Sequence, residues 1–345
     1  MRARGSSALL VLSLLGVAAG PLLAGCGSSS EPGSGDEPDT PGITVYSGRI
    51  PPLIGPVIDM YEAKVDRNVE VRFGDSGTLA ATLVEEGENS PADVFFSQDA
   101  GSLGAVDAEG LLEELPRDVL DRVPARFRAG DGDWVGVSAR ARVIAYGEDV
   151  KRAELPDSPL ELTDPKWRGR VGWAPTNASL QGYVTALRAI EGEVTARDWL
   201  EGMVANDTQV YESNTPIRDA IAAGEIDVGL INHYYVAQAK AEDPDYPVDV
   251  HFPPDDLGSL VNVTGAGVLA SSDEPADALD FVRFLLTKPA QRYFAESSQE
   301  YPLIAGVEPD RSLVPLSRIP GPEIDLGHLS DLQGTIRLMQ ETGAL

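Results

Sequence analysis

The first hundred residues of the globular region alternate between short β-type runs and amphipathic helical segments, and this alternation constrains the fold more than any other feature. Residues 43–46, 69–73 and 92–97 are predicted strands, and residues 53–63 and 78–87 are predicted helices. Repeated strand–helix–strand units build a mostly parallel sheet with helices on both faces. Such sheets bind ligands at the carboxyl ends of their strands, so the loops at 47–50, 74–77 and 98–101 should line one edge.

A second α/β region follows. Residues 137–146 form a long β-type run suited to crossing between domains, and 260–270 is a predicted strand that returns to the first domain. Further strands are predicted at 170–174, 210–214 and 227–232, and an amphipathic helix at 276–286. Thr176, Asn177 and Ser179 can cap a helix after residue 174, and the free N–H groups of a helix start bind anions.

The amino terminus is typical of a secreted lipoprotein. Residues 1–25 combine two early arginines with an apolar stretch too short to span a bilayer, as in a signal peptide. LAGC at 23–26 resembles the lipobox of bacterial lipoproteins, and Cys26 is the only cysteine of the chain. We expect a lipid on Cys26 and a disordered tether over 26–41, rich in Gly, Ser, Pro and acid; the alternative is an ordinary signal peptide with a chance cysteine.

The chain carries a formal charge of −28, which repels nucleic acid and anionic lipid. We therefore expect no nucleic-acid partner, and the protein should be held at the membrane by its lipid and not by a basic patch. One acyl chain binds a membrane only marginally, so stable anchoring needs the multiple chains of bacterial lipoproteins.

No catalytic sequence motif is found in the structural context that it requires. GDSG at 74–77 matches a protease nucleophile loop, but here it is a strand-to-helix turn. The chain has no P-loop, no HExxH and no GxGxxG behind a strand. Its three histidines, His233, His251 and His328, are too widely spaced for a zinc site. We expect no enzymatic activity, with an extracellular hydrolase as a distant alternative.

Tyr234 and Tyr235 follow the predicted strand at 227–232 in the sequence NHYY. Buried packing is one interpretation of the pair. The other is metal ligation from a loop or helix start, because adjacent strand residues would point to opposite faces. Phenolate is a hard oxygen donor, and a strongly Lewis-acidic ion such as Fe³⁺ can displace a proton of pKa ~10.

Several segments together resemble the ferric-iron-binding proteins of bacterial ABC importers, in the periplasmic-binding-protein superfamily. The similarity covers nearly all of residues 42–345 and rests on ITVYSGR (43–49), the block at 83–101, SARARVIAY (138–146), PKWRGRVG (165–172), AIAAGEIDVGLINHYY (220–235) and EYPL (300–303). It implies two doubly wound α/β domains joined by hinge strands, with the ligand in the interdomain cleft. The expected domains are 42–139 with 262–312, and 140–261 with 313–345.

The resemblance also implies a site. Tyr234 and Tyr235 match the tyrosine pair that ligates Fe³⁺ in the family. The synergistic anion, carbonate or phosphate, falls on Asn177, Ala178, Ser179, Asn214, Asn232 and Asp99. The resemblance further implies that the partners are a permease and its ATPase. The protein itself would be extracytoplasmic, lipid-anchored and monomeric.

This chain departs from the family pattern at three positions. Ile50 stands where some members carry a His ligand, Gln98 where some carry Glu, and Leu180 about where others carry a third tyrosine. Two tyrosines cannot complete an octahedral site, so an anion, water or another residue must supply the rest. We expect Arg49 to be an electrostatic partner of the anion. Arg140 and Arg142 could act similarly or form structural ion pairs. The alternative ligand is an oxyanion or thiamine-like molecule without metal.

Overall fold

A computed structural model describes residues 42–322, 324 and 326–345. The predicted signal peptide (1–25), the tether (26–41) and Cys26 lie outside the described residues. Within the described part of the chain, no helix is both long and apolar enough to cross a membrane. The described residues belong to one compact unit.

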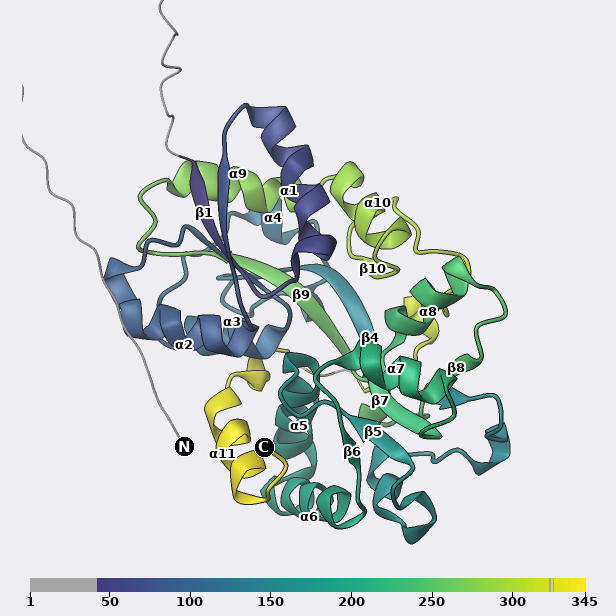
Figure 1. Ribbon diagram of the computed structural model, residues 1–345. Coiled ribbons are helices and arrows are strands. Elements are labelled where there is room, and N and C mark those ends of the chain that lie inside the picture. The colour runs from purple at the N-terminus through teal and green to yellow at the C-terminus, as the bar shows by residue number, and fades with distance from the viewer. Residues whose placement is uncertain (1–41, 323, 325) are drawn as a thin grey trace, which may run out of the picture. The chain divides into compact units, whose positions relative to one another are not determined.

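The chain folds as an α/β protein (Figure 1). Its strands are β1 Ile43–Ser47, β2 Val69–Phe73, β3 Val94–Ser97, β4 Val135–Gly147, β5 Val171–Trp173, β6 Gln209–Val210, β7 Val228–Asn232, β8 Val248–His251, β9 Val261–Val268 and β10 Tyr301–Pro302. Its α-helices are α1 Pro51–Val65, α2 Ser76–Glu86, α3 Ala100–Asp107, α4 Arg117–Leu120, α5 Ala178–Glu191, α6 Glu193–Ala205, α7 Asn214–Ala222, α8 His233–Glu242, α9 Pro275–Leu285, α10 Lys288–Glu296 and α11 Leu332–Glu341.

Local sequence explains the first helices. α1 starts with Pro51, whose missing N–H costs nothing at a helix start, and buries Ile54, Val57, Ile58 and Tyr61 on one face. α2 is capped by Asp75, which accepts hydrogen bonds from the backbone N–H groups of Gly77 and Thr78, and it ends at Gly87. The helices predicted at 53–63 and 78–87 are confirmed.

The strands pair in the order β2-β1-β3-β9-β4-β7-β5-β6, and β8 and β10 also pair with β4. β1, β2 and β3 are mutually parallel, as are β5, β6 and β7, in line with the predicted crossovers. β9 pairs antiparallel with β3 and β4, and β4 pairs antiparallel with β7. The expectation of a mostly parallel sheet is therefore wrong at the centre, where β4 and β9 carry the chain between the two groups.

β4 is a buried strand of 13 residues that belongs to both groups. Its first half, up to Ala141, pairs with β9, and its second half, from Arg142 to Tyr146, pairs with β7. The long β-type run at 137–146 thus joins the two halves as expected (Figure 1). The strand predicted at 210–214 is wrong: β6 has two residues, and Asn214 begins α7 instead.

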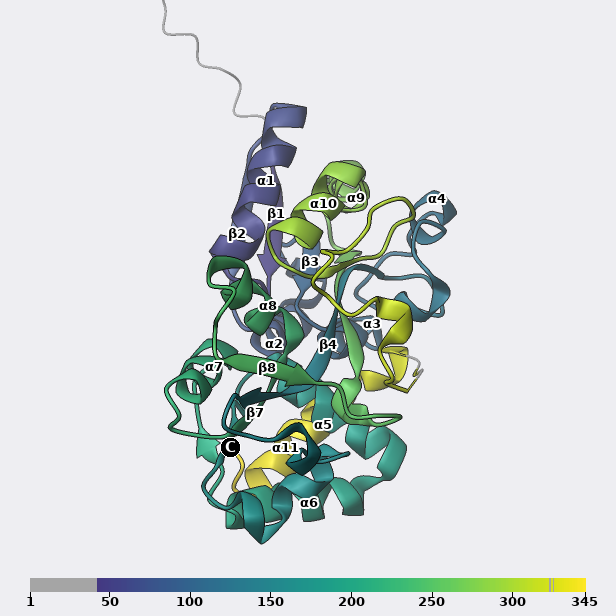
Figure 2. The same cartoon turned by 90° about the vertical axis from the view of Figure 1, so that its right-hand side faces the viewer.

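One large hydrophobic cluster extends through both halves, and a second, smaller cluster supports α8. It includes Val143, Ile217, Ile231, Val236 and Val248. α8 packs against β4, β8 and α7, and Figure 2 shows α7 and α8 next to β8. This packing holds the start of α8 at the carboxyl end of β7.

Candidate functional site

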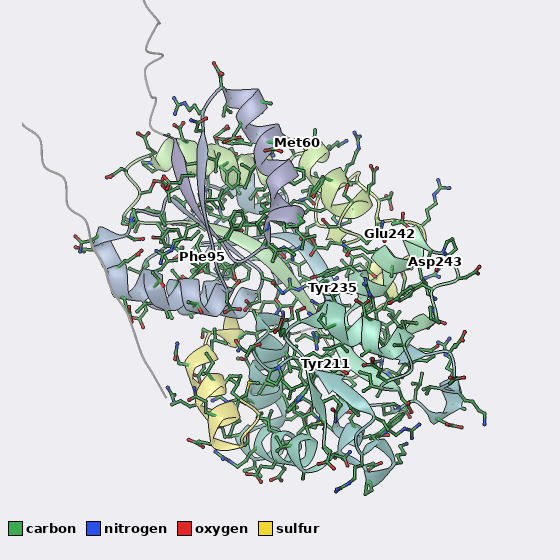
Figure 3. The ribbon with its side chains drawn as sticks, in the orientation of Figure 1. Met60, Phe95, Tyr211, Tyr235, Glu242 and Asp243 are labelled. Carbon is green, nitrogen blue, oxygen red and sulfur yellow. The ribbon has the colours of Figure 1, made fainter. Side chains whose placement is uncertain are left out.

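Tyr234 and Tyr235 lie in the first turn of α8, directly after β7 ends at Asn232. Their ring centroids are 4.3 Å apart with the planes tilted by 30°. Tyr234 is buried and Tyr235 is half-buried; Figure 3 labels Tyr235 at the start of α8. Of the two placements predicted for the pair outside the strand, a loop or a helix start, the structure shows the helix start.

The two hydroxyl groups are available to a ligand. Among the residues that the structure describes, no hydrogen bond joins the hydroxyl of Tyr234 or Tyr235 to a partner. Burial raises the pKa of Tyr234, and the neighbouring Tyr235 and Glu300 add to this effect, whereas Arg49 and Arg140 oppose it. The phenol is therefore neutral at physiological pH, and a cation that bound its oxygen would have to displace the proton.

Buried charges surround the tyrosines. Arg49 Nη2 lies 2.9 Å from Glu300 Oε1, with both side chains almost fully buried. The hydroxyl of Ser138 donates to Glu300 Oε2 over 3.1 Å. Thr264 Oγ1 accepts from Arg49 Nη1 at 3.1 Å and from Arg140 Nη1 at 3.3 Å. Sequence reasoning missed Glu300 as a site residue, although it begins the EYPL segment on which the family resemblance partly rests.

Arg140 differs from Arg49 because its charge is not matched by a contacting acid. Its side chain is 1% exposed, and its Nε and Nη2 have no hydrogen-bond partner in the described structure. Burial lowers the pKa of Arg140, while Tyr234 acts in the opposite direction. Arg142 donates to Asn232 Oδ1 at 3.3 Å and to the Leu230 carbonyl at 2.8 Å, and burial lowers its pKa to about 10. The site thus holds more buried positive than negative charge.

The structure brings four predicted anion-site residues together. Ser179 Oγ accepts from Asn232 Nδ2 at 3.0 Å, and Asn177 Oδ1 accepts from Asn214 Nδ2 at 3.4 Å and from the Ser179 N–H at 3.0 Å. Gln98 Nε2 also donates to Ser179 Oγ, over 3.0 Å. The end of β3 therefore meets the start of α5.

The start of α5 offers fewer free N–H groups than expected. Asn177 caps the helix: its side chain accepts from the Ser179 N–H, and its carbonyl accepts from Leu180 and Gln181. The prediction of a helix start with open donors is therefore wrong for the N–H groups of Ser179, Leu180 and Gln181, because the side chain and the carbonyl of Asn177 already accept from them. Ala178 is buried beside them.

Other predicted residues lie apart from this cluster. Asp99 is the N-cap of α3, and its carboxylate accepts from the backbone N–H and the hydroxyl of Ser102. Burial raises the pKa of Asp99. Ile50 is 58% exposed and has no donor atom for a metal, and Leu180 is buried. Arg49 is tied to Glu300 beside the tyrosines.

His233 connects the tyrosine pair to β4. Its Nδ1 accepts from the backbone N–H of Ala141, and its ring stacks on Tyr301 at 4.7 Å. Burial lowers the pKa of His233 to about 3. His233 is therefore neutral at physiological pH, and it fixes the first turn of α8 against the strand that joins the two halves.

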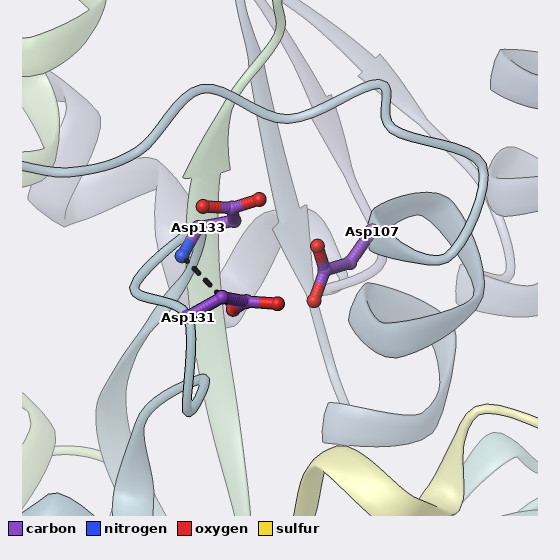
Figure 4. Close-up of side chains that lie close together, drawn as sticks. All are labelled: Asp107, Asp131 and Asp133. Atoms are coloured by element: carbon purple, nitrogen blue, oxygen red, sulfur yellow. Dashed lines mark hydrogen bonds between the residues drawn. The ribbon is translucent and has the colours of Figure 1, made fainter.

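Three carboxylates form a separate cluster at the end of α3. Oxygens of Asp107, Asp131 and Asp133 lie within 4.8 Å of one another (Figure 4), the one such grouping of His, Cys, Asp or Glu found in the part of the chain that the structure covers. Burial raises the pKa of Asp107 to about 7, and the charges of Asp131 and Asp133 contribute. Exposed acids gather in this way without an ion, so the cluster is a weaker candidate than the tyrosine pair.

Comparison with known proteins decides the family. Residues 89–316 match the family model described as bacterial extracellular solute-binding protein. The chain belongs to this family. It is 32% identical over 309 residues to the Fe(3+)-binding periplasmic protein of Serratia marcescens, covering 88% of this chain and 91% of that protein. It is 37% identical over 292 residues to iron uptake protein A2 of Synechocystis sp., covering 79% and 84%.

Solved structures agree with the family assignment. Iron-bound HitA from Pseudomonas aeruginosa has a TM-score of 0.83 at 33% identity, covering 88% of this chain and 99% of that chain. Trichodesmium FutA, in complex with iron and citrate ligands, has a TM-score of 0.74 at 30% identity with the same coverage. These matches confirm the predicted two-domain α/β class and the resemblance to ferric-iron-binding proteins. The relatives named here are binding and uptake proteins.

Proposed function

We propose that this protein binds Fe³⁺ through Tyr234 and Tyr235 together with an anion, and delivers the iron to the permease and ATPase of an ABC importer. The observation that carries the proposal is the tyrosine pair itself. Two phenol rings lie 4.3 Å apart in the first turn of α8, and neither hydroxyl is used by the described protein. Two adjacent phenols whose oxygens are both free of protein partners form a pair of donor atoms for a ligand, an arrangement that packing alone does not require.

The chemistry of the surroundings favours a trivalent ion. A buried phenol with a raised pKa loses its proton only to a strong Lewis acid, and hard phenolate oxygens suit Fe³⁺. Arg49 and Arg140 favour the phenolate form of Tyr234 because their positive charges are close and shielded from water. Ligation would release one proton from each tyrosine.

An anion would complete the coordination of the iron. Arg140 presents buried nitrogens without partners, and Asn177, Ser179, Asn214 and Asn232 form one hydrogen-bonded group. We propose carbonate or phosphate as the anion; the citrate of the Trichodesmium relative makes a carboxylate a third candidate. Arg140 could equally hold an oxyanion without iron, which the titration described below distinguishes.

We also propose that the protein acts outside the cytoplasm as a monomer, held at the cell membrane by a lipid on Cys26. The support is the sequence LAGC at 23–26, the presence of a single cysteine, and the polar segment that follows. Closure of the two halves on β4 and β9 would exclude water from the site and strengthen its charge interactions.

The test is a visible spectrum of the protein, residues 42–345, during titration with ferric iron from a weak chelator in the presence of carbonate or phosphate. A saturable charge-transfer band is expected for the wild type and should be absent from the Tyr234→Phe, Tyr235→Phe double variant. Tyr211→Phe, a half-buried tyrosine before α7, is the matched control and should keep the band. A colourless wild type with every anion would refute ferric binding and favour the metal-free oxyanion.

A further inference from the structure

Gln98 reaches from the end of β3 to the start of α5. Its backbone N–H donates to Ser76 Oγ over 2.9 Å, so the residue is anchored at its own side of the site. A Cβ at Gly48 would lie 1.9 Å from Ser76 Oγ, so only glycine lets this hydroxyl sit between the loops after β1 and β3. The side chain of Gln98 then donates from Nε2 to Ser179 Oγ over 3.0 Å.

Arg142 determines which way the Asn232 amide points. A guanidinium has donors only, so the atom that Arg142 Nη1 meets at 3.3 Å must be the Asn232 oxygen. The Asn232 nitrogen therefore faces Ser179 and donates to its Oγ over 3.0 Å. In this hydrogen bond Asn232 is therefore the donor and Ser179 Oγ is the acceptor.

A hydroxyl has two acceptor lone pairs and one proton. Asn232 and Gln98 occupy both lone pairs of Ser179 Oγ, so the hydroxyl can act further only as a donor. No described residue accepts the Ser179 proton. Arg140 is an independent case of the same imbalance, because its Nε and Nη2 are buried donors without acceptors near Tyr234. Both groups lack an acceptor, and an oxyanion supplies several.

We propose that Gln98 is a positioning residue that keeps the Ser179 hydroxyl a hydrogen-bond donor, so that the site takes Fe³⁺ together with an oxyanion that accepts this bond. The inference rests on the proposed function and deepens it, because it assigns the anion a required place in the site. A carboxylate at position 98 would act in the opposite way. It would accept the Ser179 proton, and it would add a hard negative oxygen where the anion supplies one.

The experiment compares the wild type with Gln98→Glu and Ser179→Ala. Ferric affinity is measured from the phenolate band with and without phosphate, carbonate or citrate, and anion binding to the iron-free protein is measured by calorimetry. For the wild type we expect each effective anion to tighten iron binding by about tenfold or more, as for hydrogen bonds to a charged group. Gln98→Glu should reduce this ratio to below about threefold while retaining iron without anion. Ser179→Ala should lower the ratio without any gain in anion-free affinity.

Gln333→Glu is the charge control. Gln333 is exposed and borders, with Asn177, a cavity of about 600 Å³, so the variant adds the same charge nearby without a bond to Ser179. It should keep the wild-type anion ratio. An unchanged ratio in Gln98→Glu would overturn the role of Gln98, as would a wild type that binds none of the three anions. If the wild type lacks the ferric band but binds an oxyanion that Gln98→Glu rejects, the iron assignment fails and the role of Gln98 stands.

Discussion

The buried pair of Arg49 and Glu300 allows a prediction in which fold stability decreases while iron affinity does not. The two side chains meet at 2.9 Å with exposures of 2% and 0%. Glu300→Gln keeps the shape of the side chain and an acceptor oxygen for Ser138, but it leaves Arg49 charged beside Arg140. Removing one member of a buried pair costs about 3–5 kcal/mol, and we expect about 3 kcal/mol because the Gln side chain keeps its shape and its hydrogen bond with Ser138.

The assay is urea unfolding of the iron-free protein. With a slope of about 3 kcal/mol per molar urea, the midpoint should fall by about 1 M. Arg49→Met should be destabilised similarly. The Arg49→Met, Glu300→Met double variant should be destabilised by much less than the sum of the two single variants, because neither charge of the pair is then left without its partner. A midpoint shift below about 0.3 M, or additive single variants, would refute the reasoning.

Iron affinity should not decrease together with stability. Glu300 raises the pKa of Tyr234, whereas Arg49 and Arg140 lower it, so removal of the carboxylate leaves the phenolate better compensated. Glu300→Gln should therefore bind Fe³⁺ at least as tightly as the wild type, measured by the visible band under conditions where both proteins are folded. A loss of iron affinity that parallels the loss of stability would show that Glu300 organises the site instead of opposing the phenolate.

Two further predictions concern the acidic cluster and the amino terminus. Because burial and its neighbours raise the pKa of Asp107 to about 7, the stability contributed by its bound proton is complete below about pH 4 and is lost as pH rises through 7. Asp107→Asn should therefore raise the free energy of unfolding by about 1 kcal/mol at about pH 8, an amount that already allows for solvent screening of a half-buried group. At about pH 5 the increase should be much smaller. Urea midpoints at the two pH values check this, and equal shifts would contradict it. For Cys26, metabolic labelling with a radioactive fatty acid in a bacterial host should label the full chain but not the Cys26→Ala variant. The variant should also be lost from the membrane fraction. A labelled alanine variant would place the lipid on another residue.

The sequence by itself determined the parts that depend on local pattern and on chemical type. The alternation of strands and helices predicts the α/β class, since period 2 and period 3.6 patterns are local properties. The tyrosine pair was found because two adjacent phenols are a rare donor set, and NHYY placed them after β7. The error at 210–214 has the same origin, because a short β-type run carries too little pattern to tell an edge strand from the start of α7.

Only the tertiary structure decided which of these groups meet. Arg49 and Glu300 are far apart in the chain and pair because the loop after β1 and the start of β10 converge. In the sequence, Gln98 differs from the family pattern only by the loss of a carboxylate. In the fold it donates a hydrogen bond to Ser179 Oγ, which also accepts one from Asn232. The hydrogen-bond roles of amides and hydroxyls depend on all of their neighbours at once. Strand order and the packing of elements distant in sequence set these neighbours, and no local pattern records them.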